Sequence, residues 1–200
     1  LFGPEGAAWP VMDAKGATDW PGGMKAWHRP IYTTRAITTK GAAARIAFDV
    51  FRHDGGRVTD WCDRASPGDE MAITGPGGSA LPDPVGWHGL VGDETAMPVM
   101  ARILEAMPQD ARGQAVLFVP DAADRQEIRH PSGVDLRWVL RGGDETPLDA
   151  LKTLDWPDSD RRVFFAAEKS EAVAARAYLP EAGLVKGEYM AAAYWTTDQG

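Results

Sequence analysis

The spacing of apolar residues changes near residue 79 and divides the chain into two parts. Before that point, β-branched and aromatic residues recur in short stretches, a pattern that predicts β-strands over 31–38, 44–52 and 70–74. An irregular lead-in over 1–30 is rich in Gly, Pro and Trp. Three strands are too few to close a β-barrel, because strand number and stagger are linked. If this part is a barrel, its opening strands are missing from the chain.

A short helix is expected between the last two of these strands, over 59–64. Thr59 is a residue type that caps helix N-termini, and Asp60 places negative charge at the positive end of the helix. Gly56 precedes it in a turn, so the backbone N–H groups at the helix start suit a pyrophosphate. Taken alone, the same pattern also describes an ordinary capped helix.

In the second part, after a Gly- and Pro-rich linker that begins with Gly75-Pro76-Gly77-Gly78, strands alternate with helices. This alternation favours a parallel sheet with right-handed crossovers. We therefore expect two domains, 1–78 and 79–200. The expected strands are 87–91, 115–119, 134–140, 163–167 and 189–194, and the expected helices are 95–107, 147–154 and 170–179, the last capped by Ser170.

Composition narrows the class of protein. Apolar residues make up 44% of the chain and charged residues 25%, as in soluble globular proteins, and no apolar run approaches the roughly 18 residues that a membrane span needs. The net charge of −8 argues against a nucleic acid or an anionic membrane as partner. The lone Cys62 excludes an internal disulfide.

No metal site is expected from the sequence, because the histidines lack the spacing of metal ligands. None of them is paired with a nearby Ser or Cys either, so surface or loop positions are expected for all four. They are His28, His53, His88 and His130.

The segment Gly92–Pro98 carries the strongest chemical signal in the sequence. It joins the first strand of the second part to its first helix, which is where a nucleotide-binding sheet places its ligand. Glu168, at the end of the fourth expected strand of that sheet, should lie on the same rim. It is either a charge at a helix start or a ligand contact.

A second candidate site lies between Arg29 and Arg35. The ring of Tyr32 can stack on a planar ligand, and Thr33 can form a hydrogen bond with the polar edge of that ligand. The two arginines can bind a phosphate. An exposed β segment with alternating charge would look the same.

Together these motifs resemble the siderophore-interacting proteins, which are flavin-dependent ferric-siderophore reductases of the ferredoxin-reductase superfamily. The resemblance covers the chain from about residue 9 to its end and keeps the family's order of motifs. The segments that carry it are Arg29–Arg35, Asp49–His53 with Gly56, Thr59 and Trp61, Gly75–Gly78, Gly92–Pro98, Ala167-Glu168 and Ala193-Tyr194-Trp195.

The resemblance implies an antiparallel FAD-binding β-barrel followed by a parallel-sheet NAD(P)H-binding domain, that is, an α/β plus β fold. It also implies a monomeric cytoplasmic enzyme that passes electrons from NAD(P)H through FAD to siderophore-bound Fe(III), with no catalytic residue beyond the flavin. The implied cofactor-binding residues are Arg29, Tyr32, Thr33, Arg35, His53, Gly56, Thr59, Trp61, Gly92, Asp93, Thr95, Pro98, Glu168 and Trp195, and Lys25 and Lys186 are candidates for the siderophore.

Two questions stay open at this point. Asp121 would favour NADH by meeting a free ribose hydroxyl, whereas Arg125, Arg137 and Arg141 could meet the 2′-phosphate of NADPH, which the family suggests. The alternatives to a siderophore reductase are a general NAD(P)H flavin reductase or diaphorase, and a non-catalytic protein that binds a siderophore or flavin.

Overall fold

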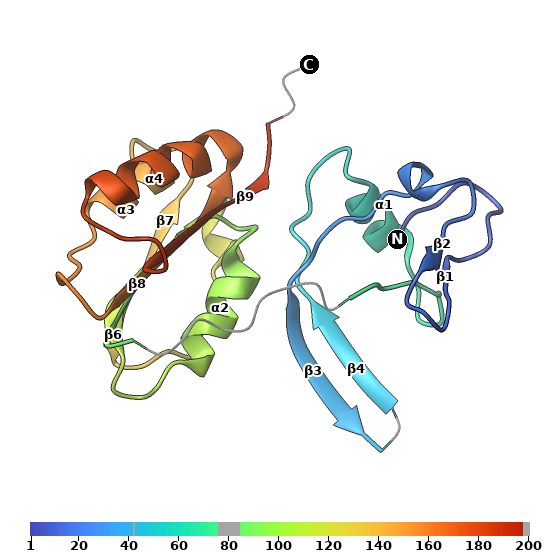
Figure 1. Cartoon of the computed structure of the whole chain (residues 1–200), viewed down its shortest axis with the longest axis horizontal. Helices are drawn as coiled ribbons and strands as arrows, with labels where there is room; N and C mark the ends of the chain where they lie inside the picture. The colour runs from blue at the N-terminus through green and yellow to red at the C-terminus, as the bar shows by residue number, and fades with distance from the viewer. Residues whose placement is uncertain (42, 76–84, 198–200) are drawn as a thin grey trace. The chain divides into compact units, whose positions relative to one another are not determined.

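The computed structural model describes residues 1–41, 43–75 and 85–197 (Figure 1). The chain divides into two compact units, which are described separately. The first comprises Leu1–Tyr32 and Arg52–Ala80, and the second comprises Thr33–Phe51 and Leu81–Gly200. Beyond Gly75, the linker expected from the sequence lies outside the described residues.

The first unit is built around tryptophan. Trp27 is buried, its ring lies 6.2 Å from that of Trp9 and 6.0 Å from that of Trp20, and its indole N–H donates to the Pro21 carbonyl at 2.9 Å. This unit also contains two short antiparallel strands. The prediction of an irregular lead-in is therefore correct only in part. Its elements are β1 (Val11–Met12), β2 (Thr18–Asp19), the 3-10 helix η1 (Met24–Ala26) and α1 (Arg57–Arg64).

Two of the three strands expected in the first part form an antiparallel hairpin, β3 (Thr34–Lys40) with β4 (Ala43–Phe48). The third prediction, a strand over 70–74, is wrong. Met71 and Ile73 are each about half exposed, and no described strand pairs with this segment. A strand needs a neighbour for its backbone N–H and C=O groups, so the residues stay irregular. The described antiparallel strands therefore form two separate pairs.

The second unit contains a five-stranded sheet in which every pair is parallel and the order is β7-β6-β5-β8-β9. All five predicted strands are confirmed, with small shifts at their ends. They are β5 (Trp87–Gly92), β6 (Arg112–Val119), β7 (Gly133–Leu140), β8 (Arg161–Glu168) and β9 (Tyr189–Trp195).

Helices cover both faces of this sheet (Figure 1). One face packs against α2 (Met97–Ala106), and the other packs against α3 (Pro147–Lys152) and α4 (Lys169–Glu181). Neighbouring residues of a strand point to opposite faces, so Leu90 belongs to the first core and Val91 to the second. The β6–β7 connection carries only the 3-10 helix η2 (Ala122–Asp124).

Three helix starts differ from the prediction. The N-cap of α1 is Gly56, not Thr59, because the Thr59 hydroxyl accepts a hydrogen bond from the His53 backbone N–H at 3.1 Å instead. The N-cap of α4 is Glu168, not Ser170, because the longer carboxylate reaches forward to the Ser170 N–H. Helix α2 begins at Met97, two residues later than expected.

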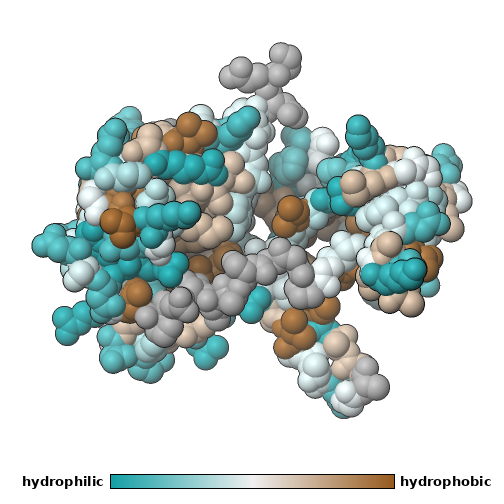
Figure 2. All heavy atoms as spheres, in the orientation of Figure 1, coloured by the Kyte–Doolittle hydropathy of each residue, from teal (hydrophilic) through white to brown (hydrophobic). Residues whose placement is uncertain are grey.

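The face of the five-stranded part seen in Figure 2 is mainly hydrophilic, with isolated apolar side chains. Among the residues that the structure describes, no helix combines the length and the apolar character that crossing a membrane requires.

Candidate functional site

The centre of the parallel sheet is a topological switch point. β6 lies on one side of β5 and β8 on the other, and the chain leaves β5 for α2 on one face and β8 for α4 on the opposite face. In such sheets the crevice beyond the carboxyl ends of these two strands is where nucleotides bind. The predicted residues Gly92–Pro98 and Glu168 both lie at this rim.

The turn after β5 is tightly built. A side chain at Gly92 would meet the Ala96 Cβ at 2.6 Å and the Ala166 carbonyl at 2.9 Å, so the strand end, the turn and β8 approach closely. The Asp93 carbonyl accepts from the backbone N–H groups of Ala96 and Met97. Pro98 lies in the first turn of α2, where its missing N–H costs no hydrogen bond.

Asp93 holds the rim together. It is 2% exposed, and its Oδ1 accepts from the backbone N–H of Thr95 at 2.9 Å and from the Thr95 hydroxyl at 2.5 Å. Its Oδ2 accepts from the indole N–H of Trp195, at the end of β9, at 2.6 Å. The structure thus brings Gly92, Asp93, Thr95 and Trp195, all named among the expected cofactor-binding residues, together at one rim.

Glu94 is a rim residue that the sequence reasoning did not include in the site. It is 3% exposed, and its Oε1 forms an ion pair with Arg141 at 2.9 Å, while its Oε2 is buried without a hydrogen-bond partner among the described residues. Burial raises the pKa of this carboxyl, against the opposing effects of its own backbone N–H and Arg141. The Arg141 guanidinium in turn lies 5.5 Å from the centre of the Trp195 ring.

Glu168 ties the end of β8 to the chain that follows β9. One oxygen accepts from the Ser170 N–H and hydroxyl, and the other accepts from the Thr197 N–H at 3.2 Å. These hydrogen bonds, led by that of the Ser170 hydroxyl, lower the pKa of Glu168 to about 2. Its role as a helix-start charge is therefore observed.

A second group of predicted residues lies in the first unit, around the start of α1. The N-terminus of α1 has no side-chain cap, and a side chain at Gly56 would meet the His53 ring at 2.7 Å. Thr59 is buried, and its bond to His53 closes this turn. Tyr32 lies near Cys62, a residue of α1, and burial raises the pKa of the Tyr32 phenol.

The two arginines predicted to meet a phosphate have protein partners. The Arg29 guanidinium lies 5.3 Å from the centre of the Trp20 ring. Arg35, on β3, donates to both carboxylate oxygens of Glu105 in α2, at 2.8 and 2.6 Å, and its Nε lies 3.6 Å from Asp49. Thr33 and Arg35 belong to the second unit, whereas Arg29 and Tyr32 belong to the first.

The remaining candidates lie away from the rim. Lys186 precedes β9 and forms a bridge with Tyr189, so it lies at the end of the sheet opposite the switch point. Lys25 is exposed in η1, and Trp61 is half-buried in α1. The expectation for His88 was wrong: it is 3% exposed on β5, because this central strand is covered on both faces.

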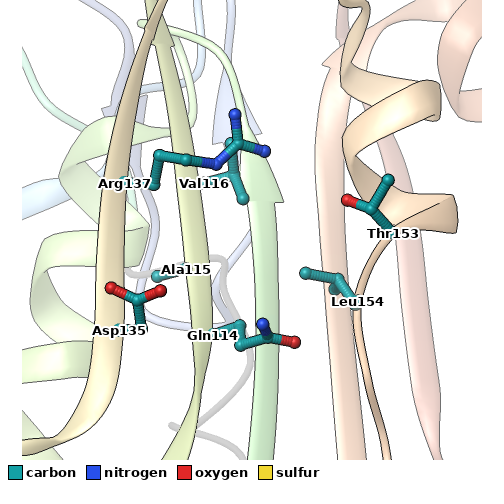
Figure 3. A pocket seen from close by; sticks show the side chains of 7 residues that line it. All are labelled: Gln114, Ala115, Val116, Asp135, Arg137, Thr153 and Leu154. Carbon is teal, nitrogen blue, oxygen red and sulfur yellow. The ribbon is translucent and has the colours of Figure 1, made fainter.

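A small pocket also lies away from the rim, alongside β6, β7 and the end of α3 (Figure 3). Its volume of about 60 Å³ is well below the several hundred that a nucleotide would need. Arg137, at its edge, donates to both oxygens of Glu145 at 2.7 Å. Within the described part of the chain, no cluster of three or more His, Cys, Asp or Glu side chains could hold a metal ion.

The strand order and the rim residues define a dinucleotide-binding α/β domain, here combined with a second unit. The chain belongs to the siderophore-interacting protein family. Residues 85–198 match the siderophore-interacting protein family itself, and residues 1–80 match the siderophore-interacting FAD-binding domain.

Curated relatives include two named reductases. The ferric vibriobactin reductase ViuB of Vibrio cholerae is 30% identical over 178 residues, which is 84% of this chain and 65% of ViuB. The NADPH-dependent ferric-chelate reductase of Escherichia coli is 31% identical over 161 residues, 75% of this chain and 60% of that protein. An uncharacterized protein of Mycobacterium tuberculosis is 37% identical, over 70% of this chain and 55% of its own length. The chain thus spans 55–65% of these relatives.

Solved structures agree on the fold. A siderophore utilization protein from T. fusca has a TM-score of 0.85 at 28% identity, covering 100% of this chain and 78% of that protein. SipS from Aeromonas hydrophila has a TM-score of 0.77 at 26% identity, covering 98% and 82%. The predicted fold class is therefore confirmed, with a parallel five-stranded sheet and antiparallel strands in the FAD-binding region.

Proposed function

We propose that this protein is an FAD-dependent reductase that moves electrons from NAD(P)H through flavin to Fe(III) held by a siderophore, releasing Fe(II). The observation that supports this most is that both parts of the chain match one family, while two relatives carry the names of ferric reductases. The proposed domains are 1–78 for FAD and 79–200 for NAD(P)H.

The residues of the first unit fit FAD. The uncapped N-terminus of α1 and the absence of a side chain at Gly56 suit a pyrophosphate, because backbone N–H groups there can approach closely. The Thr59 hydroxyl is already engaged by His53, so its proposed role is to hold this turn in shape. Tyr32 would bind the ring system, with Arg29 and Trp61 of the same unit as further contacts. Thr33 and Arg35, also proposed to bind FAD, belong to the second unit. A bound FAD supplies the redox chemistry, accepting a hydride and giving single electrons.

The rim of the second unit fits a nicotinamide nucleotide. Gly92, Asp93, Thr95 and Pro98 shape the turn at the switch point, and Trp195 and Glu168 close it from β9 and β8. NADPH is favoured by the name of the NADPH-dependent ferric-chelate reductase among the relatives, and Asp121, which could meet a free ribose hydroxyl, is engaged as the cap of η2. Arg137 is held by Glu145 away from the rim.

The substrate side of the proposal is a ferric siderophore met by basic residues, with Lys25 and Lys186 as candidates. We further propose a monomer in the cytoplasm. Hard catecholate or hydroxamate oxygens hold Fe(II) less well than Fe(III), so reduction by itself would release the metal.

An anaerobic visible spectrum of the FAD-supplemented protein tests the proposal. Addition of NADPH should bleach the flavin bands, and a ferric siderophore should restore them while an Fe(II) chelator develops colour. Failure to retain FAD would contradict the proposed role of this chain in flavin binding.

The choice of acceptor separates the alternatives. A siderophore reductase should reduce a ferric siderophore faster than ferric citrate, whereas equal rates would indicate a general flavin reductase. Binding of FAD or a ferric siderophore without any NAD(P)H oxidation would identify a non-catalytic protein instead.

A further inference from the structure

Asp93, Glu94 and Glu168 all lie at the rim, and their carboxylate oxygens differ in whether they accept hydrogen bonds. Asp93 receives hydrogen bonds on both oxygens, from Thr95 and Trp195. Glu168 also receives them on both, from Ser170 and Thr197. These four oxygens are committed to holding the turn after β5, the start of α4 and the chain after β9. Glu94 is the exception, because only its Oε1 has a partner.

The second oxygen of Glu94, Oε2, is buried in an energetically unfavourable position. The side chain is 2% exposed, so water does not solvate the Oε2 atom, and no described group donates to it. A buried acceptor without a donor destabilises a protein, and more so when it is charged. Buried polar atoms that stay unpaired in this way are often found at functional sites, where a ligand supplies the missing group.

The surroundings of Glu94 say what kind of group would fit. Arg141, which forms an ion pair with its Oε1, lies over the Trp195 ring and is 36% exposed, so the group beside Glu94 reaches the surface. Asp93 and Asp124 also act on Glu94, so a phosphate would be repelled by this group of carboxylates. A neutral N–H or O–H donor fits the acceptor oxygen without adding charge.

A nicotinamide dinucleotide carries such donors at its nicotinamide end, in the carboxamide amine and the ribose hydroxyls. We propose that Glu94 is a binding residue for this end of the coenzyme, its Oε2 accepting a hydrogen bond from one of these neutral donors. The inference rests on the proposed NAD(P)H site and adds a contact that fixes the position of the nicotinamide half.

Calorimetric titration of the purified protein with three probes tests this assignment. The probes are NADP⁺, its 3-acetylpyridine analogue, which has a methyl group in place of the carboxamide amine, and 2′,5′-ADP, which lacks the nicotinamide half. Glu94→Gln is compared with Glu145→Gln, which breaks the ion pair to Arg137 on the same sheet but away from the rim. Circular dichroism and thermal melting establish that both variants are folded.

Glu94→Gln should weaken NADP⁺ binding about tenfold, the typical effect of losing a hydrogen bond to a charged group, and should not weaken 2′,5′-ADP. Glu145→Gln should change neither. If the donor is the carboxamide, the analogue binds the wild type weakly and the substitution weakens it no further. If the donor is a ribose hydroxyl, the analogue and NADP⁺ lose affinity alike in the variant.

Two results would overturn the assignment of Glu94 alone. One is NADP⁺ affinity that Glu94→Gln leaves unchanged in a folded protein. The other is an equal loss for 2′,5′-ADP, which would place the effect on the adenosine half. Failure of the wild type to bind NADP⁺ and 2′,5′-ADP at all would instead overturn the proposed coenzyme site, and this inference with it.

Discussion

Gly92 ends β5 at a point where even a methyl group does not fit, since the nearest obstacles include the backbone carbonyl of Ala166. Gly92→Ala should therefore lower the free energy of unfolding by about 2 kcal/mol, as overpacking of a dense site does. Urea denaturation measures the loss. Gly143→Ala is the control, because the nearest atom to its added methyl group is 3.7 Å away. Equal losses for the two variants would contradict the crowding at Gly92.

His88 predicts a pH dependence of stability. Burial lowers its pKa, with Arg162 adding to the effect and the Val85 carbonyl and Asp160 opposing it. Below pH 6.5 the unfolded chain then binds a proton that the folded protein does not. Stability should be full above that pH and should fall as the pH drops through the lowered pKa.

Thermal melts between pH 5 and 8 measure this effect. His88→Leu should flatten the part of the profile below pH 6.5, because it removes the buried group that titrates there. A wild-type profile that stays flat below pH 6.5 would mean that His88 binds its proton equally well in both states.

At the level of single residues, the sequence indicates which residues belong to the site better than it indicates their burial and their partners. Asp93 and Thr95 were predicted at the site because their motif follows a strand and precedes a helix, which is local information. The burial of Glu94 and its pairing with Arg141 depend on β7 reaching the same rim, and nothing near residue 94 reports it. The acidic residue inside the motif was the available signal.

Among the elements, the end of β9 is joined to the turn after β5 by the hydrogen bond from Trp195 to Asp93. Trp195→Phe keeps an aromatic ring but removes the N–H that Asp93 accepts, leaving the buried Oδ2 without a donor. The expected loss is about 2 kcal/mol in the free energy of unfolding, together with faster amide exchange after residue 193. Trp156→Phe is the matched control, because that ring meets Tyr178 on a helix-covered face. Unchanged exchange at the end of β9 would show that the bond does not hold this strand.

Element boundaries were the least predictable feature, for physical reasons that differ from case to case. Thr59 has the chemistry of a cap, but His53 competes for its hydroxyl, and that contact comes from outside the helix. The segment 70–74 has the composition of a strand and lacks a described partner. The strands of the parallel sheet were predicted well because both faces are buried, which leaves continuous apolar runs in the sequence.

For the whole molecule, both hydrophobic cores are formed by residues between Trp87 and Ala192. A fragment of residues 79–200 should therefore fold by itself, although it loses the contacts that the β3–β4 hairpin makes with α2 through Arg35 and Arg102. Far-ultraviolet circular dichroism should show a cooperative thermal transition. A broad, non-cooperative melt would indicate that the hairpin is part of the folding unit and that the domain boundary needs revision.

The hydrogen bond between Asp93 and Trp195 joins residues 102 positions apart in the chain. Synthesis on the ribosome proceeds from the N-terminus, so β5, β6 and β8 can pair before Trp195 has been made. A nascent chain at that stage would have most of its sheet but an open, unfinished coenzyme rim. Closure of the proposed coenzyme rim thus has to wait for Trp195, after the strands that support the rim have been made.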